Sequence, residues 1–245
     1  MDRALEPAKL LSSLSEQQAL LAAAIGAAAS PEGDLHILEA GCGQEWPIRI
    51  PGVHLRITGV DLDADALRMR QEQQGDLDEA IVGDLLSCEL PANSFDVAYC
   101  SFVLEHIAGA ERVLDRLVGA VRPGGRIVVL VPNGRSVYGF ASKHAPLRAA
   151  ILYKRYVEGR KDAGKPGHAP YPTVYDPVVT LDGMRDYAAR NGLTVIEEYG
   201  IDYVLRHFAS LGPVVSQAMR AVARASRGRL TASHNNLGFV LQLPA

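Results

Sequence analysis

The residues that could do chemistry begin at a glycine-rich turn, Gly41-Cys42-Gly43, directly after an apolar run at 35–40. Two glycines separated by one residue allow a tight turn where the backbone approaches a ligand closely, because no side chain blocks it. Asp61 stands 18 residues after Gly43, at the end of the next apolar run. A strand-end carboxylate at this spacing suits hydrogen bonds from two ribose hydroxyls. The pattern therefore predicts a site for a nucleotide-type cofactor.

The residues after this turn discriminate between two cofactor classes. A dinucleotide site requires a third glycine, in the pattern G-x-G-x-x-G, so that a pyrophosphate can approach a helix N-terminus. Glu45 and Trp46 follow instead, and an acidic side chain would repel a pyrophosphate. S-adenosylmethionine carries a sulfonium and an amino group, which an acidic rim favours. An NAD-dependent oxidoreductase is therefore the weaker interpretation.

Five motifs in chain order resemble those of the class I S-adenosylmethionine-dependent methyltransferases. They are ILEAGCG at 37–43, VDLD at 60–63, VGDLL at 82–86, FDVAYCSFVLEHI at 95–107 and VRPGGRIVVLVPN at 121–133. The resemblance implies that the methionine part of the cofactor lies at Glu39, Ala40, Gly41, Cys42 and Gly43. It implies that Asp61 binds the ribose, that Asp84 binds the adenine amino group with Leu85 beside the ring, and that Cys100 and Ser101 line the methyl-transfer point. Leu62 and Gly83 are expected to be further cofactor contacts.

Several of these residues have structural alternatives. Asp61 could cap a helix that begins near Ala64, and Asp84 could stabilise a turn. Glu105-His106 could open a helix and form only local hydrogen bonds. The crossover after Gly43 also departs from the family, because Glu45 replaces a glycine and two prolines fall inside it; we expect its helix to be short or absent. This departure leaves open a catalytically silent, cofactor-binding regulator.

The elements that position these residues alternate between strands and helices. Apolar runs typical of strands buried on both faces lie at 35–40, 57–60, 80–82, 96–100, 126–131, 193–201 and 237–243. Helical patterns cover 64–74, 110–121 and 180–190. We therefore expect an α/β fold, a Rossmann-like doubly wound seven-stranded sheet with an antiparallel last strand, within a single methyltransferase domain over 1–245.

The N-terminal segment, 1–33, contains an alanine-rich run that imitates the apolar part of a signal peptide. The preceding flank is acidic where a signal peptide is basic. Ser13 and Glu16 have capping-box spacing, so we expect a helix from there to Pro31. The three cysteines are too few and too scattered for a disulfide framework. These features favour a cytoplasmic protein without stable membrane insertion.

Two inserts interrupt the 34–133 core and the C-terminal part of the sheet, 179–245. The first, 134–178, follows the fifth strand and is expected to be an acceptor lid; the second, 202–235, is helical in pattern. Residues 135–165 hold eight Lys or Arg and two acids, and 202–235 hold five and one, in a chain of net charge −3. Basic inserts at the presumed acceptor mouth suit a polar or anionic acceptor, although Arg220, Arg224 and Arg227 could be a solvated helix face.

The acceptor residues are predicted from residue type. A hydroxyl acceptor must lose a proton, which a histidine can accept near neutral pH; His144 is the first candidate base, followed by His106 and His168. The candidate acceptor contacts are Glu105, Tyr138, Tyr153, Tyr156, Tyr171 and Tyr175. No grouping of acids marks a metal site, so magnesium is compatible but not required.

The sequence favours methyl transfer to a hydroxyl of a small polar molecule, and a saccharide is the expected acceptor. The pattern around VPNGRSVYG resembles sugar O-methyltransferases of the mycobacterial methylmannose polysaccharide pathway. A phenol, a quinone or another natural-product intermediate is the alternative acceptor. The [DNS]PP[YFW] motif of base N-methyltransferases is absent after the fourth strand, and the net charge speaks against a nucleic-acid partner. A homo-oligomer is compatible with the sequence.

Overall fold

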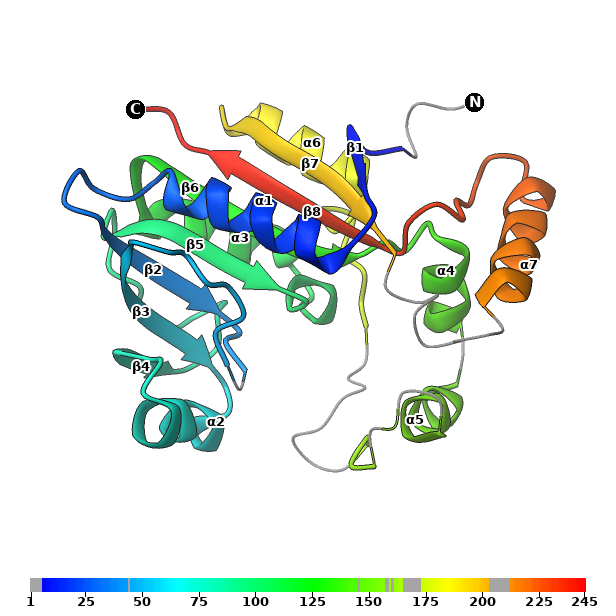
Figure 1. The fold of residues 1–245 in the computed structure, drawn as a ribbon, viewed down its shortest axis with the longest axis horizontal. Helices are drawn as coiled ribbons and strands as arrows, with labels where there is room; N and C mark the ends of the chain where they lie inside the picture. Colours follow the sequence, from blue (N-terminus) through cyan, green and yellow to red (C-terminus); the bar gives the residue numbers. More distant parts are fainter. Residues whose placement is uncertain are drawn as a thin grey trace.

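The computed structural model describes residues 6–43, 45–144, 146–156, 159, 161–164, 173–202 and 212–245. One sheet runs through the molecule, in the strand order β1-β7-β8-β6-β5-β2-β3-β4 (Figure 1). Its strands are β1 (Lys9–Leu11), β2 (Asp34–Ala40), β3 (His54–Asp61), β4 (Glu79–Val82), β5 (Phe95–Ser101), β6 (Val121–Pro132), β7 (Thr194–Ile201) and β8 (Asn236–Gln242). β8 is antiparallel to both β6 and β7, and the other strand pairs are parallel.

Helices and short helical turns connect most of the strands. They are α1 (Leu14–Gly26), α2 (Ala64–Met69), the π-helical turn η2 (Arg70–Gln74), the 3₁₀ turn η3 (Leu104–His106), α3 (Ala110–Ala120), α4 (Val137–His144), α5 (Leu147–Tyr156), α6 (Leu181–Arg190) and α7 (Gly212–Ala225). None of the helices in the described part of the chain combines the length and the apolar character that crossing a membrane requires.

The prediction of seven strands is wrong by one. The seven expected strands are present as β2 to β8, and β8 is antiparallel as expected. The additional strand, β1, has three residues and pairs with β7, for example Lys9 with Tyr199. A three-residue strand carries no measurable alternation in the sequence, because its formation depends on an edge supplied by a distant strand.

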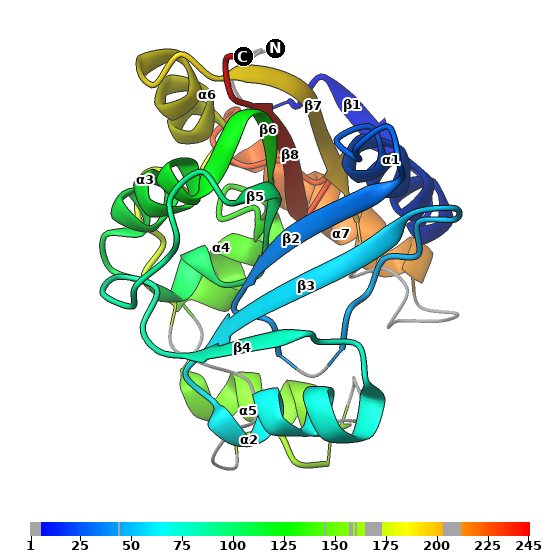
Figure 2. The same cartoon turned by 90° about the vertical axis from the view of Figure 1, so that its left-hand side faces the viewer.

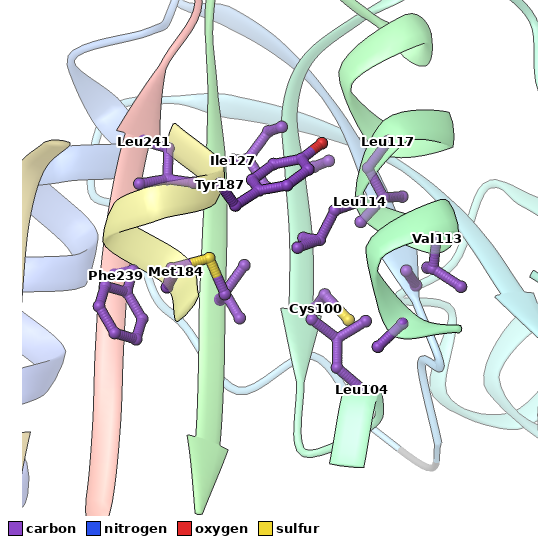
Figure 3. Packing of buried hydrophobic residues seen from close by; sticks show 14 of the residues in the cluster. Cys100, Leu104, Val113, Leu114, Leu117, Ile127, Met184, Tyr187, Phe239 and Leu241 are labelled. Atoms are coloured by element: carbon purple, nitrogen blue, oxygen red, sulfur yellow. The ribbon is translucent and has the colours of Figure 1, made fainter. Parts of the chain in front are cut away.

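Helices cover both faces of the sheet, with α1 on one face and α3 and α6 on the other (Figure 2). In α1, Leu21 and Ile25 are almost inaccessible and pack against the strands. On the opposite face, Tyr187 of α6 and Leu114 of α3 pack against aliphatic side chains of the central strands (Figure 3). The doubly wound arrangement is therefore a three-layer sandwich, which exposes the carboxyl edge of the parallel strands between the layers.

α1 begins as the sequence predicts but ends earlier. Ser13 caps its N-terminus by accepting a hydrogen bond from the Glu16 backbone N–H at 3.1 Å. The Glu16 carboxylate accepts from the Ser12 N–H at 2.8 Å, one residue earlier than a capping box requires. The helix ends at Gly26, where a Cβ would lie 3.1 Å from the Ile50 side chain. The helix therefore ends where it packs closely against the crossover after β2, five residues before Pro31.

The first crossover contains no helix in its described residues, 45–53, as the two prolines predict. The inserts supply α4, α5 and α7. Figure 1 places α4 and α7 beyond the carboxyl ends of the parallel strands, where ligands bind in open α/β sheets.

Candidate cofactor and acceptor site

The turn after β2 needs its two glycines for different reasons. Gly41 has φ +70°, and a Cβ there would lie 2.2 Å from Val103 Cγ2, so only glycine fits beneath Val103. Gly43 has φ +56°, and nothing lies within 4 Å of the position of a Cβ. Packing therefore requires Gly41, whereas Gly43 faces open space that a ligand can approach. This open cradle fits the methionine part of S-adenosylmethionine.

Asp61 lies at the carboxyl end of β3, next to this turn. Its Oδ2 accepts a hydrogen bond from the Gly43 N–H at 3.1 Å, and its Oδ1 accepts from the Asp63 N–H at 2.9 Å. The helix cap of α2 is Asp63, which accepts from the N–H groups of Asp65 and Ala66. The alternative role of Asp61 as the helix cap is therefore wrong. Its carboxylate instead joins the end of β3 to the glycine turn.

Apolar side chains are exposed beside Asp61. Leu62 is 74% exposed and Val82, at the end of β4, is 60% exposed. Exposed aliphatic groups at adjacent strand ends offer a surface for a flat aromatic base. Val82 was not among the predicted contacts, although its place at a strand end, next to Gly83, is readable from the sequence.

Asp84 and Leu85 differ from the expected picture. The Oδ1 atom of Asp84 accepts the Leu86 N–H at 2.8 Å, which is the turn role that was the alternative. Leu85 is 6% exposed and packs in the hydrophobic core. The Leu85 side chain therefore cannot lie beside an exposed ring, and only its backbone remains for such a contact.

The side chains of the glycine turn and of the strand before it point away from solvent. Glu39, Ala40 and Cys42 are 3%, 1% and 4% exposed. Cys42 packs against Gly59, and burial raises the pKa of its thiol to about 12. Any contact of these residues with a cofactor must therefore use backbone atoms.

Arg70 lies directly behind the glycine turn, and the sequence analysis did not select it. Its guanidinium is completely buried and donates to Glu39 Oε2 at 2.7 Å and to the Cys42 carbonyl at 2.8 Å. It also pairs with Asp76, with Arg70 Nε 3.1 Å from Asp76 Oδ1. Burial raises the pKa of Glu39 to about 7, against the opposing pull of the Arg70 charge. The only available signal was the i, i+3 spacing of Arg70 from Leu67, which is also buried.

Cys100 does not line the carboxyl edge of β5. Its side chain is fully buried and lies against the layer of Leu104 and α3 (Figure 3). Burial raises the pKa of the Cys100 thiol far above its ordinary value. Ser101, the last residue of β5, is half-buried, and Phe102 after it has φ +56°. A left-handed non-glycine residue is strained and often marks a functional turn.

Glu105 lies on η3, directly beyond the end of β5. It is 3% exposed, and its Oε2 has no hydrogen-bond partner among the described residues. Burial raises the pKa of Glu105 to about 7. The Nε2 of His106 lies 3.8 Å from Glu105 Oε1, and the Glu105 carbonyl accepts the Val174 N–H at 2.7 Å. A buried carboxyl group that titrates near neutral pH can take up a proton there.

Tyr175 is the predicted acceptor tyrosine that lies next to Glu105. Its N–H donates to the Glu105 carbonyl at 3.3 Å. Burial and the Glu105 charge together raise the pKa of its hydroxyl to about 12. Lys143 Nζ lies 5.4 Å from the centre of the Tyr175 ring. The end of the first insert therefore covers Glu105.

The other acceptor candidates lie elsewhere or outside the described residues. Tyr138 and Tyr153 form a ring pair with centroids 6.3 Å apart, and Tyr156 is 82% exposed. His144 is exposed, and its Nδ1 lies 2.8 Å from the Phe140 carbonyl of its own helix. His168 and Tyr171 fall in the part of the chain that the structure does not describe. The described residues contain no group of three His, Cys, Asp or Glu side chains that could hold a metal ion.

The family described as a methyltransferase domain matches residues 38–129 of this chain. An uncharacterized methyltransferase of Mycobacterium tuberculosis is 34% identical over 106 residues, which are 41% of this chain and 52% of that protein. The demethylmenaquinone methyltransferase of Listeria monocytogenes serovar 1/2a is 24% identical over 138 residues, which are 50% of this chain and 58% of that protein. The chain thus spans about half the length of the curated relatives it matches.

Among solved structures, an S-adenosylmethionine-dependent methyltransferase from Mesorhizobium loti has a TM-score of 0.52 at 18% identity, covering 90% of this chain and 96% of that one. At this identity the likeness shows the fold alone. Together with the five motifs, the matched domain supports a class I S-adenosylmethionine-dependent methyltransferase fold and cofactor site over residues 38–129. S-adenosylmethionine is the cofactor of this class, and the open turn at Gly43 beside Asp61 fits it.

Proposed function

We propose that the chain transfers a methyl group to a hydroxyl of a small polar acceptor, with Glu105 and His106 removing the proton. The observation that carries this proposal is the buried Glu105 carboxyl, which lies just beyond β5 and has one oxygen without a hydrogen-bond partner among the residues that the structure describes. A hydroxyl must lose its proton as it attacks, whereas a preformed nucleophile needs no base. A carboxyl group with a pKa of about 7 is poised for that transfer at neutral pH.

The cofactor, when bound, supplies a methyl group on a sulfonium, which is activated for in-line displacement. We assign its methionine part to the backbone of Gly41, Cys42 and Gly43, and its ribose to the Asp61 carboxylate. The exposed Leu62 and Val82 side chains would face the adenine ring, together with the backbone of Gly83, Asp84 and Leu85. These residues would bind and orient the cofactor, and Ser101 and Phe102 connect the end of β5 to the turn that carries Glu105.

Proton removal falls to the residues after β5. The acceptor hydroxyl would donate to the Glu105 carboxylate, directly or through His106, which stands beside it. The backbone N–H groups of Val174 and Tyr175 donate to the Glu105 carbonyl, and the Tyr175 hydroxyl is close enough for the Glu105 charge to raise its pKa. His106 is preferred to His144 because His144 is exposed and bonded to its own helix. His168 stays a candidate from the sequence alone.

The acceptor-side helices support a polar or anionic acceptor, such as a saccharide. α4, α5 and α7 contain no acidic residue, and several of their basic side chains are exposed: Lys143, Arg148, Arg155, Arg220 and Arg224. Tyr138 and Tyr153 add flat faces with polar tips, which suit a sugar ring.

The free thiols of Cys42, Cys88 and Cys100 suit a reducing compartment such as the cytoplasm.

A quinone or phenolic acceptor is the second candidate. It is favoured by exposed apolar side chains on the same helices: Phe140 at 46%, Leu152 at 52% and Val214 at 65%. The name of the Listeria relative also points to a quinone for that protein.

The test is an acceptor screen with isotopically labelled S-adenosylmethionine and mass spectrometry of the products. Hexoses, hexose phosphates and hydroquinones are offered in parallel. We expect an O-methylated product, lost in Glu105→Gln and retained in Glu111→Gln, a half-buried glutamate of α3 that pairs with Arg190. Methylation of an amine or a carbon would contradict the proposal. Binding of S-adenosylhomocysteine without turnover on any acceptor would favour the silent regulator.

A further inference from the structure

A buried charge cluster lies directly beneath the cofactor turn. Its centre is the Arg70 guanidinium, which is 0% exposed. Glu39 and the Cys42 carbonyl accept from Nη1 at 2.7 and 2.8 Å. Asp76 accepts from Nε at 3.1 Å and from Nη2 at 3.3 Å. One side chain therefore joins the end of β2, the glycine turn and the segment before β4.

Asp76 extends this cluster into the crossover. Its Oδ2 accepts the Trp46 N–H at 2.8 Å. The crossover has no helix in its described residues, so this hydrogen bond and the buried Ile48 side chain fix its path. The turn η2 makes the geometry possible, because Gly75, with φ +66°, closes it and places Asp76 beside Arg70.

The contacts require the shape of a guanidinium as well as its charge. Arginine presents donors in a planar fork, so it can reach Glu39, Cys42 and Asp76 at once from one position. A lysine ammonium would keep the charge opposite Glu39 but could not hold the same three partners. Replacing Arg70 with lysine therefore keeps the positive charge and removes the forked set of hydrogen bonds.

We propose that Arg70 is the positioning residue of the cofactor turn: it holds the backbone at 41–43 in its binding conformation, in place of a crossover helix. Arg70 does not touch the cofactor in this assignment and acts through Cys42, Glu39 and Asp76. The inference rests on the use of S-adenosylmethionine but not on the identity of the acceptor, so binding alone tests it.

The experiment compares Arg70→Lys with wild type by titration calorimetry of S-adenosylhomocysteine and by thermal melting. We expect Kd to rise at least tenfold while the protein remains folded. Arg185→Lys is the matched control, because Arg185 also forms a forked pair, with both Glu198 oxygens at 2.7 Å, but on α6 and β7. We expect Arg185→Lys to lower Tm and to leave Kd within twofold.

Trp46 gives a direct readout of the turn. It is the only tryptophan of the chain, and its backbone N–H donates to Asp76 Oδ2. Its ring meets the Tyr99 ring edge-on, with centroids 5.1 Å apart. We expect the Trp46 emission to shift to the red in Arg70→Lys and to be unchanged in Arg185→Lys. A purely stabilising ion pair would lower Tm without moving either Kd or the emission of the folded protein.

A second variant, Asp76→Asn, serves if Arg70→Lys does not fold. It preserves the Arg70–Glu39 pair and weakens the link to Trp46, and we expect a smaller rise in Kd, about threefold to tenfold, with the same red shift. If wild type binds and both Kd and emission stay unchanged in the folded variants, the positioning role is overturned. If wild type itself does not bind S-adenosylhomocysteine, the cofactor assignment fails first and the proposal falls with it.

Discussion

Charged side chains are arranged differently around the proposed cofactor turn and on the helices of the proposed acceptor side. Around the glycine turn, Arg70 and Glu39 are buried and paired, and Asp61 holds backbone N–H groups. On α4, α5 and α7, basic side chains such as Arg220 and Arg224 are exposed, and none of these helices contains an acid. Paired buried charges fix one geometry, whereas exposed charges of one sign attract an opposite charge without fixing a shape. The comparison predicts a rigid backbone at the glycine turn and a more adaptable binding surface on α4, α5 and α7.

The largest expected effect is a loss of turnover without a loss of cofactor binding. Glu105→Gln should lower turnover by about 100-fold to 10,000-fold, since it removes the proposed base. Binding of S-adenosylhomocysteine should stay within twofold, because Glu105 is not among the residues that we assign to the cofactor. Initial rates and calorimetry measure the two effects. Normal turnover would remove Glu105 from the mechanism and return attention to the histidines.

The Glu105→Gln variant should also change how the free energy of unfolding depends on pH. Burial raises the pKa of Glu105 from 4.5 to about 7, so the folded protein keeps a proton that the unfolded chain loses between these values. The stability from this group is fully present below pH 4.5 and is lost as the pH rises through 7, by about 3 kcal/mol. Denaturant melts at pH 5 and pH 8 should show a smaller difference for Glu105→Gln than for wild type. Equal differences would mean that Glu105 does not titrate in the folded state.

The next effect tests the rigidity of the cofactor half. Gly41→Ala should cost about 2–4 kcal/mol of stability, from overpacking against Val103 and from a positive φ. Gly119→Ala is the control, because nothing lies within 4 Å of its Cβ position in α3; it should stabilise by about 0.5–1 kcal/mol. Urea melts of the three proteins measure this. A Gly41→Ala protein as stable as wild type would show that the turn relaxes easily.

A smaller effect separates binding from capping at neighbouring acids. Asp61→Ala should weaken S-adenosylhomocysteine binding by about 10-fold to 100-fold, because hydrogen bonds to a carboxylate contribute about 1.5–3 kcal/mol. Asp63→Ala should spare binding and lose about 1 kcal/mol of stability, since Asp63 caps α2. Thermal shift with and without ligand distinguishes the two. Equal ligand shifts in both variants would argue against Asp61 as the ribose contact.

The smallest effect concerns the acceptor side. Arg220→Glu combined with Arg224→Glu should raise the KM for an anionic acceptor by about threefold to tenfold and leave kcat unchanged. Added salt should likewise raise the KM of the wild-type enzyme for an anionic acceptor, because it screens the attraction between the charges. The control combines Arg56→Glu with Arg68→Glu, which reverses as many charges near β3 and α2. If both double variants behave alike, the helices contribute no specific attraction.

The sequence predicted the cofactor strands well and the acceptor side less well. Asp61 was readable because a strand end and a glycine turn are local patterns that a parallel sheet brings to one edge. Arg70 was not readable, because an arginine between polar residues looks like a surface residue until its partners, 28 and 31 residues away, are known. Leu85 and Cys100 were misplaced for a related reason: the motif gives their position in the chain, but not which way their side chains point.

By itself, the sequence determined the order of the seven expected strands, the glycine turn and the lack of a helix in the described part of the first crossover. The order of its motifs also indicated a methyltransferase of class I. These follow from hydrophobic periodicity, proline and glycine conformation and motif order, which act over a few residues. Only the tertiary structure decided the edge strand β1, the buried Arg70 cluster and the buried Glu105 carboxyl. Each of these depends on burial, which comes from distant segments packing together and which raises the pKa of Glu105 and gives the Arg70 contacts their strength.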